Sequence, residues 1–269
     1  MKFGFEAYTW QMSRADYAGQ IDHIVDVVSQ CGGEGIEPEV CMLGDYAKTP
    51  AKLKDLLSSR SVSLAAICYV EDWLHDGETD DESARAASVI DYISRFPGSL
   101  LQLCPRSGKD RADLRKRQAN AIRCINDIAR RAADKGIECA VHLNSPPGSV
   151  FRTRDEYEIL LSGLDSSVVG FAPDSGHIVR GGMDPLETIR TYRPLVRHVH
   201  FKDVSASGEW VEMGRGTLDF PAIVSHLAGT GYEGWVIVED ESALANSDPD
   251  EATRRNAAYI RDNLLALAR

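Results

Sequence analysis

Short apolar runs alternate with longer segments of helical periodicity along the whole chain, and this alternation restricts the possible folds more than any other feature. A strand repeatedly followed by a helix forms parallel βαβ units. The expected strands span residues 2–10, 35–40, 63–70, 99–104, 137–143, 168–174, 196–202 and 234–239. Eight such units in 269 residues are typical of a barrel. We therefore predict an α/β fold, a single (β/α)8 TIM-barrel domain over residues 1–269.

The expected helices begin and end at local signals. Thr49-Pro50 and Asp184-Pro185 each place an N-cap residue before a proline, and Gly136 follows the end of a long helical pattern. An open, doubly wound sheet is the alternative fold. The Gly-x-Gly-x-x-Gly fingerprint of dinucleotide-binding sheets is absent after the first expected strand, so the barrel is favoured.

Charge and composition narrow the possible partners. The formal net charge is −11, which argues against nucleic acid, because affinity for a polyanion depends on clustered Lys and Arg. The six cysteines form no Cys-x-x-Cys pair, and several lie inside apolar runs, which indicates buried thiols. The N-terminus lacks the apolar region of a signal peptide, and no apolar run is long enough to span a membrane. We expect a cytoplasmic protein without membrane contact.

Four expected strands carry a metal-ligating residue near their carboxyl ends, where barrels place their chemistry: His142, Asp174, His200 and Glu239. The two-residue period of a strand allows all four to face the barrel interior. Burying two unpartnered carboxylates would cost several kcal/mol each. Two imidazoles and two carboxylates suit Mn²⁺, Fe²⁺, Co²⁺ or Zn²⁺ better than Mg²⁺. The pattern predicts one divalent metal ion; a buried ionic cluster with Lys202 and Arg215 as the cations is the alternative.

Several motifs in residues 136–241 resemble the xylose isomerase-like TIM-barrel superfamily, in particular its sugar isomerase/epimerase and inosose dehydratase members. The motifs are Asp174-Ser175-Gly176-His177, His198-Val199-His200 followed by Lys202-Asp203, Gly214-Arg215-Gly216-Thr217-Leu218-Asp219-Phe220, and Gly231-Tyr232-Glu233-Gly234-Trp235 leading to Glu239. The resemblance implies that Asp174, His200 and Glu239 ligate a divalent metal and that His177 lies near the substrate. Before residue 136 it is only architectural.

The chain departs from this family on the fifth strand. Isomerases and epimerases of the family usually have a glutamate there, as fourth ligand and as one of two acid/base groups, whereas this chain has His142. A histidine at this position is more similar to the inosose dehydratase branch. His142 is therefore a candidate ligand and a candidate base.

We predict a divalent-metal-dependent isomerase or epimerase of a keto-sugar or related polyol, with Mn²⁺ as the expected ion. The reaction would begin with proton abstraction next to a metal-bound carbonyl, with Glu239, His142 or His177 as the base. A metal-dependent dehydratase or lyase, similar to inosose dehydratase or acting on a 3-keto-glycoside, is the main alternative. A non-catalytic sugar-binding protein is a third. An enzyme like endonuclease IV would need more histidines and a basic surface.

The substrate is expected to be a small carbohydrate or cyclitol. Residues expected to contact it are His177, Lys202, Arg215, Trp10 and Glu37. Tyr8 and Trp73 could form apolar walls, and Glu6 could bind hydroxyl groups. Arg215 lies between two glycines after the seventh strand, near the usual phosphate site of barrels, which makes a phosphorylated substrate conceivable. The resemblance also allows a homo-oligomer.

Overall fold

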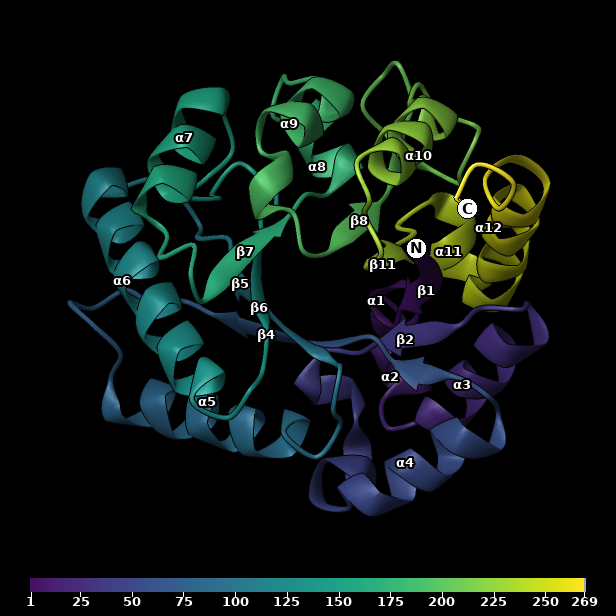
Figure 1. Cartoon of the computed structure of the whole chain (residues 1–269), viewed down its shortest axis with the longest axis horizontal. Coiled ribbons are helices and arrows are strands. Elements are labelled where there is room, and N and C mark those ends of the chain that lie inside the picture. Colours follow the sequence, from purple (N-terminus) through teal and green to yellow (C-terminus); the bar gives the residue numbers. More distant parts are fainter. Residues whose placement is uncertain (269) are drawn as a thin grey trace.

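The computed structural model describes residues 1–268, in which a ring of parallel strands is surrounded by helices (Figure 1). All pairings between strands of the ring are parallel. Its strands are β1 (Lys2–Glu6), β2 (Gly35–Glu37), β3 (Ser63–Leu64) continued by β4 (Ala66–Glu71), β5 (Leu100–Pro105), β6 (Cys139–His142), β7 (Val169–Ala172), β8 (Val199–Phe201) and β11 (Trp235–Val238). The predicted barrel is confirmed.

The ring divides into two sheets, ordered β3-β2-β1-β11-β8 and β4-β5-β6-β7. One seam falls between β3 and β4, and an isolated parallel bridge between Glu39 and Cys68 joins the sheets there. At the other seam, between β7 and β8, Phe171 bridges to Val196 and Asp174 to His200. The last of these bridges brings two of the predicted metal ligands onto neighbouring strands.

The helices around the ring largely follow the predicted segments. They are α1 (Tyr8–Gln11), α2 (Arg14–Tyr17), α3 (Ile21–Gln30), α4 (Pro50–Ser59), α5 (Asp80–Ile93), α6 (Leu114–Ala133), α7 (Arg154–Gly163), α8 (Ser175–Arg180), α9 (Pro185–Thr191), α10 (Phe220–Gly229), α11 (Ala243–Ser247) and α12 (Pro249–Asn263). The side chain of Asp184 caps α9 as expected, accepting from the amide of Glu187 at 2.6 Å. Within residues 1–268, none of the helices has the length and apolarity needed to cross a membrane.

The apolar faces of the helices bury the outside of the ring. Ile24 and Val28 of α3 and Ile125 and Ile128 of α6 are completely buried, and they recur at the three- and four-residue spacing of one helix face. Burial of each such side chain contributes about 1.5–3 kcal/mol. This packing leaves the carboxyl ends of the strands to form the site.

The first strand is shorter than predicted. We expected a strand to Trp10, but β1 ends at Glu6, and the chain turns into α1 with the amides of Trp10 and Gln11 both donating to Ala7 O. The aromatic and β-branched residues of this segment favour a strand locally. The indole of Trp10 is instead completely buried, and its Nε1 donates to Asp250 Oδ1 at 2.7 Å. Contact with α12 therefore overrides the local preference.

Candidate active site

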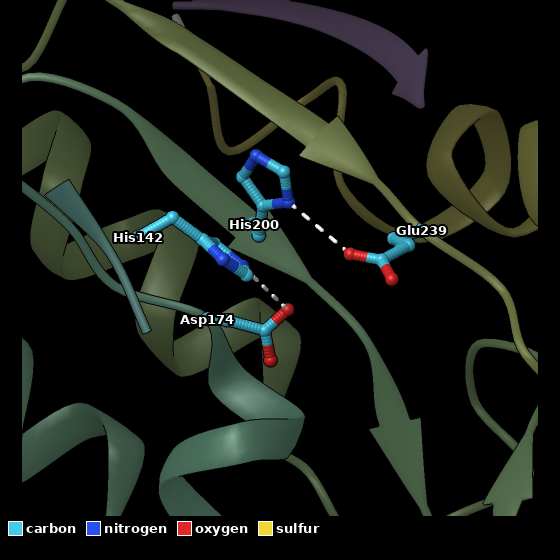
Figure 2. Close-up of side chains that lie close together, drawn as sticks. All are labelled: His142, Asp174, His200 and Glu239. Carbon is cyan, nitrogen blue, oxygen red and sulfur yellow. Dashed lines mark ion pairs between the residues drawn. The ribbon is translucent and has the colours of Figure 1, made fainter. Parts of the chain in front are cut away.

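Four side chains from consecutive strand ends converge at the carboxyl end of the barrel (Figure 2). His142 ends β6, Asp174 follows β7, His200 lies within β8, and Glu239 follows β11. Each offers one ligand atom, all these atoms lie within 4.8 Å of one another, and all four residues are buried. We call these residues the quartet. The structure therefore brings the four predicted metal ligands together.

The quartet contains buried polar atoms that no hydrogen bond satisfies. His142 Nε2, Asp174 Oδ2 and His200 Nδ1 have no hydrogen-bond partner. Within the quartet, His142 Nε2 lies 3.5 Å from Asp174 Oδ2 and His200 Nδ1 lies 3.5 Å from Glu239 Oε2, well beyond the usual hydrogen-bond length of about 2.9 Å. Outside the quartet, Oε2 of Glu6 lies 3.3 Å from His200 Nδ1. A buried unsatisfied polar atom costs about 1–3 kcal/mol.

These separations fit a shared metal ion. Nitrogen and oxygen ligands about 2.1 Å from one ion lie about 3.4 Å apart in a tetrahedral arrangement. An ion among the unpaired atoms would remove the cost of their burial. The mixed imidazole and carboxylate donors also suit divalent transition metals. The quartet could therefore hold one divalent cation.

Glu37 lies beneath the quartet and orients His200. Its carboxylate is completely buried and accepts from Nε2 of His198 at 2.6 Å and from Nε2 of His200 at 3.2 Å. Burial opposes ionisation of Glu37, but the two imidazoles lower its pKa below the ordinary value. Burial lowers the pKa of His200, but Glu37, Glu239 and Glu6 raise it well above the ordinary value in the absence of a cation. In the neutral ring that a metal ion requires, donation from Nε2 to Glu37 leaves the Nδ1 lone pair directed toward the quartet. Glu37, which we expected to bind substrate, contacts imidazoles instead.

Lys202 and His177 form a second buried group of polar side chains beside Glu239. The ammonium of Lys202 donates to Glu239 and, at 2.5 Å, to Glu241, and lies 3.2 Å from Nε2 of His177. Burial lowers the pKa of Lys202, but Glu239 and Glu241 raise it well above the ordinary value, so the amine is charged. Burial and then Lys202 lower the pKa of His177 to about 3, so the imidazole is neutral.

The contacts of His177 also fix its tautomer. An ammonium group can only donate, so Nε2 of His177 is the acceptor from Lys202. The proton of the neutral ring then lies on Nδ1, which is 2.8 Å from Ser145 Oγ. The ring edge of Trp210 faces His177, with centroids 5.2 Å apart at 88°. His177 is thus held firmly at the edge of the quartet.

A cavity of about 370 Å³ lies above these residues, a volume in the range of small-molecule sites. His142, His177 and Glu239 line one part of it. Gln102 and Trp210 line other parts, and neither was predicted from the sequence. Other lining residues are Glu6, Tyr8, Gln11, Asn144, Arg180 and Glu241. Tyr8, which we expected to form an apolar wall, and Glu6, which we expected to bind hydroxyl groups, therefore both lie at the cavity.

Lys202, like Glu37, was expected to contact the substrate but does not line the cavity. Three more residues expected near the substrate lie elsewhere. Trp10 packs against α12, as described above, and Trp73 is completely buried beside Tyr69. The side chain of Arg215 is 66% exposed and lies 3.8 Å from Glu212. None of the three lines the cavity above the quartet.

The loop that carries Arg215 binds a carboxylate of the chain itself. The amides of Gly214 and Gly216 both donate to Oδ2 of Asp203 at 2.9 Å, and φ of Gly214 is +79°, which favours glycine. Backbone donors arranged in this way could bind an anion. Because Asp203 already occupies these donors, the loop gives no support to a phosphorylated substrate.

Comparison with known proteins agrees with this architecture. A family model described as xylose isomerase-like TIM barrel matches residues 25–263. This chain belongs to the xylose isomerase-like TIM-barrel family. A curated relative, inosose dehydratase of Clostridium beijerinckii, is 31% identical over 156 residues, which cover 51% of this chain and 52% of the relative. The chain thus spans about half the length of this curated relative.

Two solved structures share the fold of the family over their whole length. The IolI protein with a bound zinc atom has a TM-score of 0.77 and 15% identity, covering 100% of this chain and 98% of its own. The 3-keto-D-glucoside 4-epimerase of E. coli has a TM-score of 0.77 and 16% identity, covering 97% and 99%. At these identities the likeness shows the fold alone.

Proposed function

We propose that this chain is a divalent-metal-dependent isomerase or epimerase that abstracts the proton next to the carbonyl group of a keto-sugar or keto-cyclitol. The observation that carries the proposal is the convergence of unsatisfied ligand atoms of His142, Asp174 and His200 beside Glu239 at the base of a cavity (Figure 2). The family supports the same chemistry, because relatives of this fold include a dehydratase and an epimerase of keto compounds. Mn²⁺ is the ion we expect.

A bound divalent ion supplies Lewis acidity, which polarises a carbonyl and stabilises the negative charge that proton removal creates. Glu239 is the base we favour. Burial raises its pKa, but Lys202 and the nearby imidazole of His200 lower it well below the ordinary value, so the group is an ionised carboxylate. Its position on the cavity wall gives it access to a bound substrate.

Gln102 provides a means of orienting the substrate. Its side chain is completely buried, it lines the cavity, and both its amide oxygen and its amide nitrogen lack a hydrogen-bond partner. One carboxamide offers a donor and an acceptor to sugar hydroxyls. A substrate that satisfied both atoms would be held with its carbonyl end near the quartet.

Neither His177 nor Lys202 is suited to supply the acid that elimination needs. Expelling hydroxide or alkoxide needs a group that gives a proton to the leaving oxygen. His177 is neutral, with its Nε2 lone pair occupied by Lys202, and the pKa of Lys202 is too high for easy proton release. Returning the abstracted proton to carbon requires no such acid.

Elimination is the second candidate, because of His142. This residue stands where isomerases and epimerases of the resembling family usually have a glutamate, and its unpaired Nε2 points into the quartet. If His142 ligates the ion, it is not available as a second base on the opposite face of the substrate. The match to inosose dehydratase also supports this candidate.

Proton exchange in deuterated water distinguishes these outcomes. The Mn²⁺-loaded protein would be incubated with 3-keto-glucose or with a keto-inositol, and the products followed by NMR. Deuterium next to the carbonyl, with an epimer or isomer and no dehydrated product, supports the leading proposal. A dehydrated product supports the second candidate. Absence of exchange with every keto substrate, in protein that holds its metal, overturns both. Arg215→Ala is the matched control and should exchange at the wild-type rate.

A further inference from the structure

A second cavity, of about 430 Å³, lies beside the cavity above the quartet. The two share four lining residues, Glu39, Cys68, Val70 and Arg106. Val70 belongs to β4, Glu39 lies two residues after the end of β2, and Arg106 directly follows β5. A ligand bound above the quartet can therefore extend across the end of β4 without leaving the surface of the protein.

The second cavity differs in chemistry from the first. Val40, Tyr69, Val70 and Val89 contribute apolar surface, and Val40 is one of the large hydrophobic residues that remain exposed. No quartet residue lines it. Such a surface would gain from contact with an apolar group, because that contact removes apolar area from water.

The charged residues at the second cavity are already paired. Arg85 contacts Glu71 at 2.7 Å, and Arg106 lies 3.5 Å from Asp72. The carboxylate of Glu39 lies on the boundary with the first cavity. Paired arginines beside a further carboxylate disfavour a phosphate or another anion at this position. The charge distribution thus points to an uncharged occupant.

We propose that the second cavity is the subsite for the apolar, preferably aromatic, aglycone of a keto-glycoside whose sugar ring occupies the cavity above the quartet. This inference rests on the proposed function, since it assumes that the sugar ring binds next to the metal. It narrows the substrate from keto-sugars in general to glycosides with an apolar substituent. Continuity of the two cavities across Val70 is the observation that connects ring and aglycone.

The test compares two probes that differ only in the aglycone, methyl 3-keto-glucopyranoside and phenyl 3-keto-glucopyranoside. Titration calorimetry on the Mn²⁺-loaded protein measures both dissociation constants. We expect the phenyl glycoside to bind about 10- to 100-fold more tightly, the range for filling a hydrophobic pocket with a few more carbon atoms.

Two substitutions in α5 test whether the preference for the phenyl glycoside arises at the second cavity. Ser88 is exposed and lines the second cavity, so Ser88→Trp should fill it and abolish the preference for phenyl. Ala87 is also exposed on α5 but does not line the cavity, so Ala87→Trp should keep the preference. Binding of the methyl glycoside should be equal in all three proteins.

Three results would count against the inference. Equal affinity for the two probes in the wild-type protein, with proton exchange on both, removes the aglycone subsite and leaves the proposed function in place. If the metal-loaded protein binds neither probe and catalyses no exchange, the proposed function fails as well. Loss of the phenyl preference in Ala87→Trp would also count against the second cavity as its location.

Discussion

Two groups of buried histidines and carboxylates meet at His200, and they differ in how their polar atoms are satisfied. In the lower group, the carboxylate of Glu37 accepts hydrogen bonds of 2.6 and 3.2 Å from His198 and His200, and one buried atom, Nδ1 of His198, has no partner. In the quartet, the closest imidazole and carboxylate atoms are 3.5 Å apart, and three ligand atoms have no hydrogen-bond partner. Residue types and burial are alike in the two groups. Unsatisfied atoms beside a cavity, rather than proximity of residue types, mark the candidate metal centre.

The comparison gives each group a separate role. The quartet offers lone pairs to an ion, and the lower group holds one imidazole in the orientation that makes this possible. His200 belongs to both, with Nδ1 in the quartet and Nε2 on Glu37. Substitutions in the two groups should therefore differ in severity.

The largest effect is expected from Asp174→Asn. The amide oxygen can still accept from the amide of His177, which Asp174 Oδ1 does at 2.7 Å, so α8 keeps its cap. The anionic ligand is lost, and metal affinity should fall about 100-fold or more, since even residues behind the ligands cost 10–100-fold. Elemental mass spectrometry after dialysis should find about one ion per wild-type chain and almost none in the variant. Equal metal content in the wild-type protein and Asp174→Asn would show that the quartet is not the metal centre, and would remove the proposed difference between the quartet and the lower group.

Glu37→Gln tests the lower group. The two imidazoles contact different oxygens of the Glu37 carboxylate, and in the variant an NH₂ group replaces one of these oxygens and opposes one N–H. Metal affinity should fall about 10- to 100-fold, while one ion still binds at saturation. A competition titration with a chelating dye measures the change. Glu39→Gln is the matched control, because Glu39 lines the cavity without contacting the quartet. An equal loss in the control would refute the orienting role.

Trp10→Phe tests whether an aromatic residue outside both groups contributes to substrate binding. The variant loses the hydrogen bond from Trp10 Nε1 to Asp250, so the free energy of unfolding should fall by about 1.5 kcal/mol. KM should not change, because Trp10 does not line the cavity. Chemical denaturation and steady-state kinetics measure the two quantities. A raised KM with unchanged stability would restore the sequence-based prediction for this residue.

Arg215→Ala should have the smallest effect. The side chain is mostly exposed, and its contact with Glu212 is a surface ion pair of 3.8 Å. Stability should change by no more than about 0.5 kcal/mol, and turnover by no more than about twofold. Thermal unfolding and a rate measurement check both. A large loss of turnover would show that the loop closes over the substrate.

The sequence predicted the barrel and the quartet for a common reason. Each strand is a short apolar run. The last residue expected to face the barrel interior is of a metal-ligating type, such as Asp174 after β7 or Glu239 after β11. Parallel strands align these ends, so spacing along the chain translates directly into spacing in the structure. The predicted elements agree with the observed ones mainly where this regular alternation holds.

The positions of the remaining residues depend on tertiary contacts, which cannot be predicted from the spacing of residues along the chain. Trp10 follows a strand-like pattern but turns toward α12, and Arg215 points outward because its loop wraps around Asp203. Gln102 is one polar residue in an apolar strand, and its importance is visible only once its carboxamide is found unpaired. Trp210 lies in a short hairpin after β8, and the prediction of eight strand–helix units did not include this hairpin.

Lys202 also decides how many ions this end of the barrel can hold. His177, Glu239 and Glu241 offer three further ligand atoms within 4.8 Å of one another, an arrangement that could accept a second metal ion. The ammonium of Lys202 contacts all three, and a positive charge at that point excludes another cation. With the proposed ion bound at the quartet, the lysine would keep the centre mononuclear. Replacing it with a small neutral residue is a one-step route to a binuclear centre, the type used by many phosphatases and nucleases.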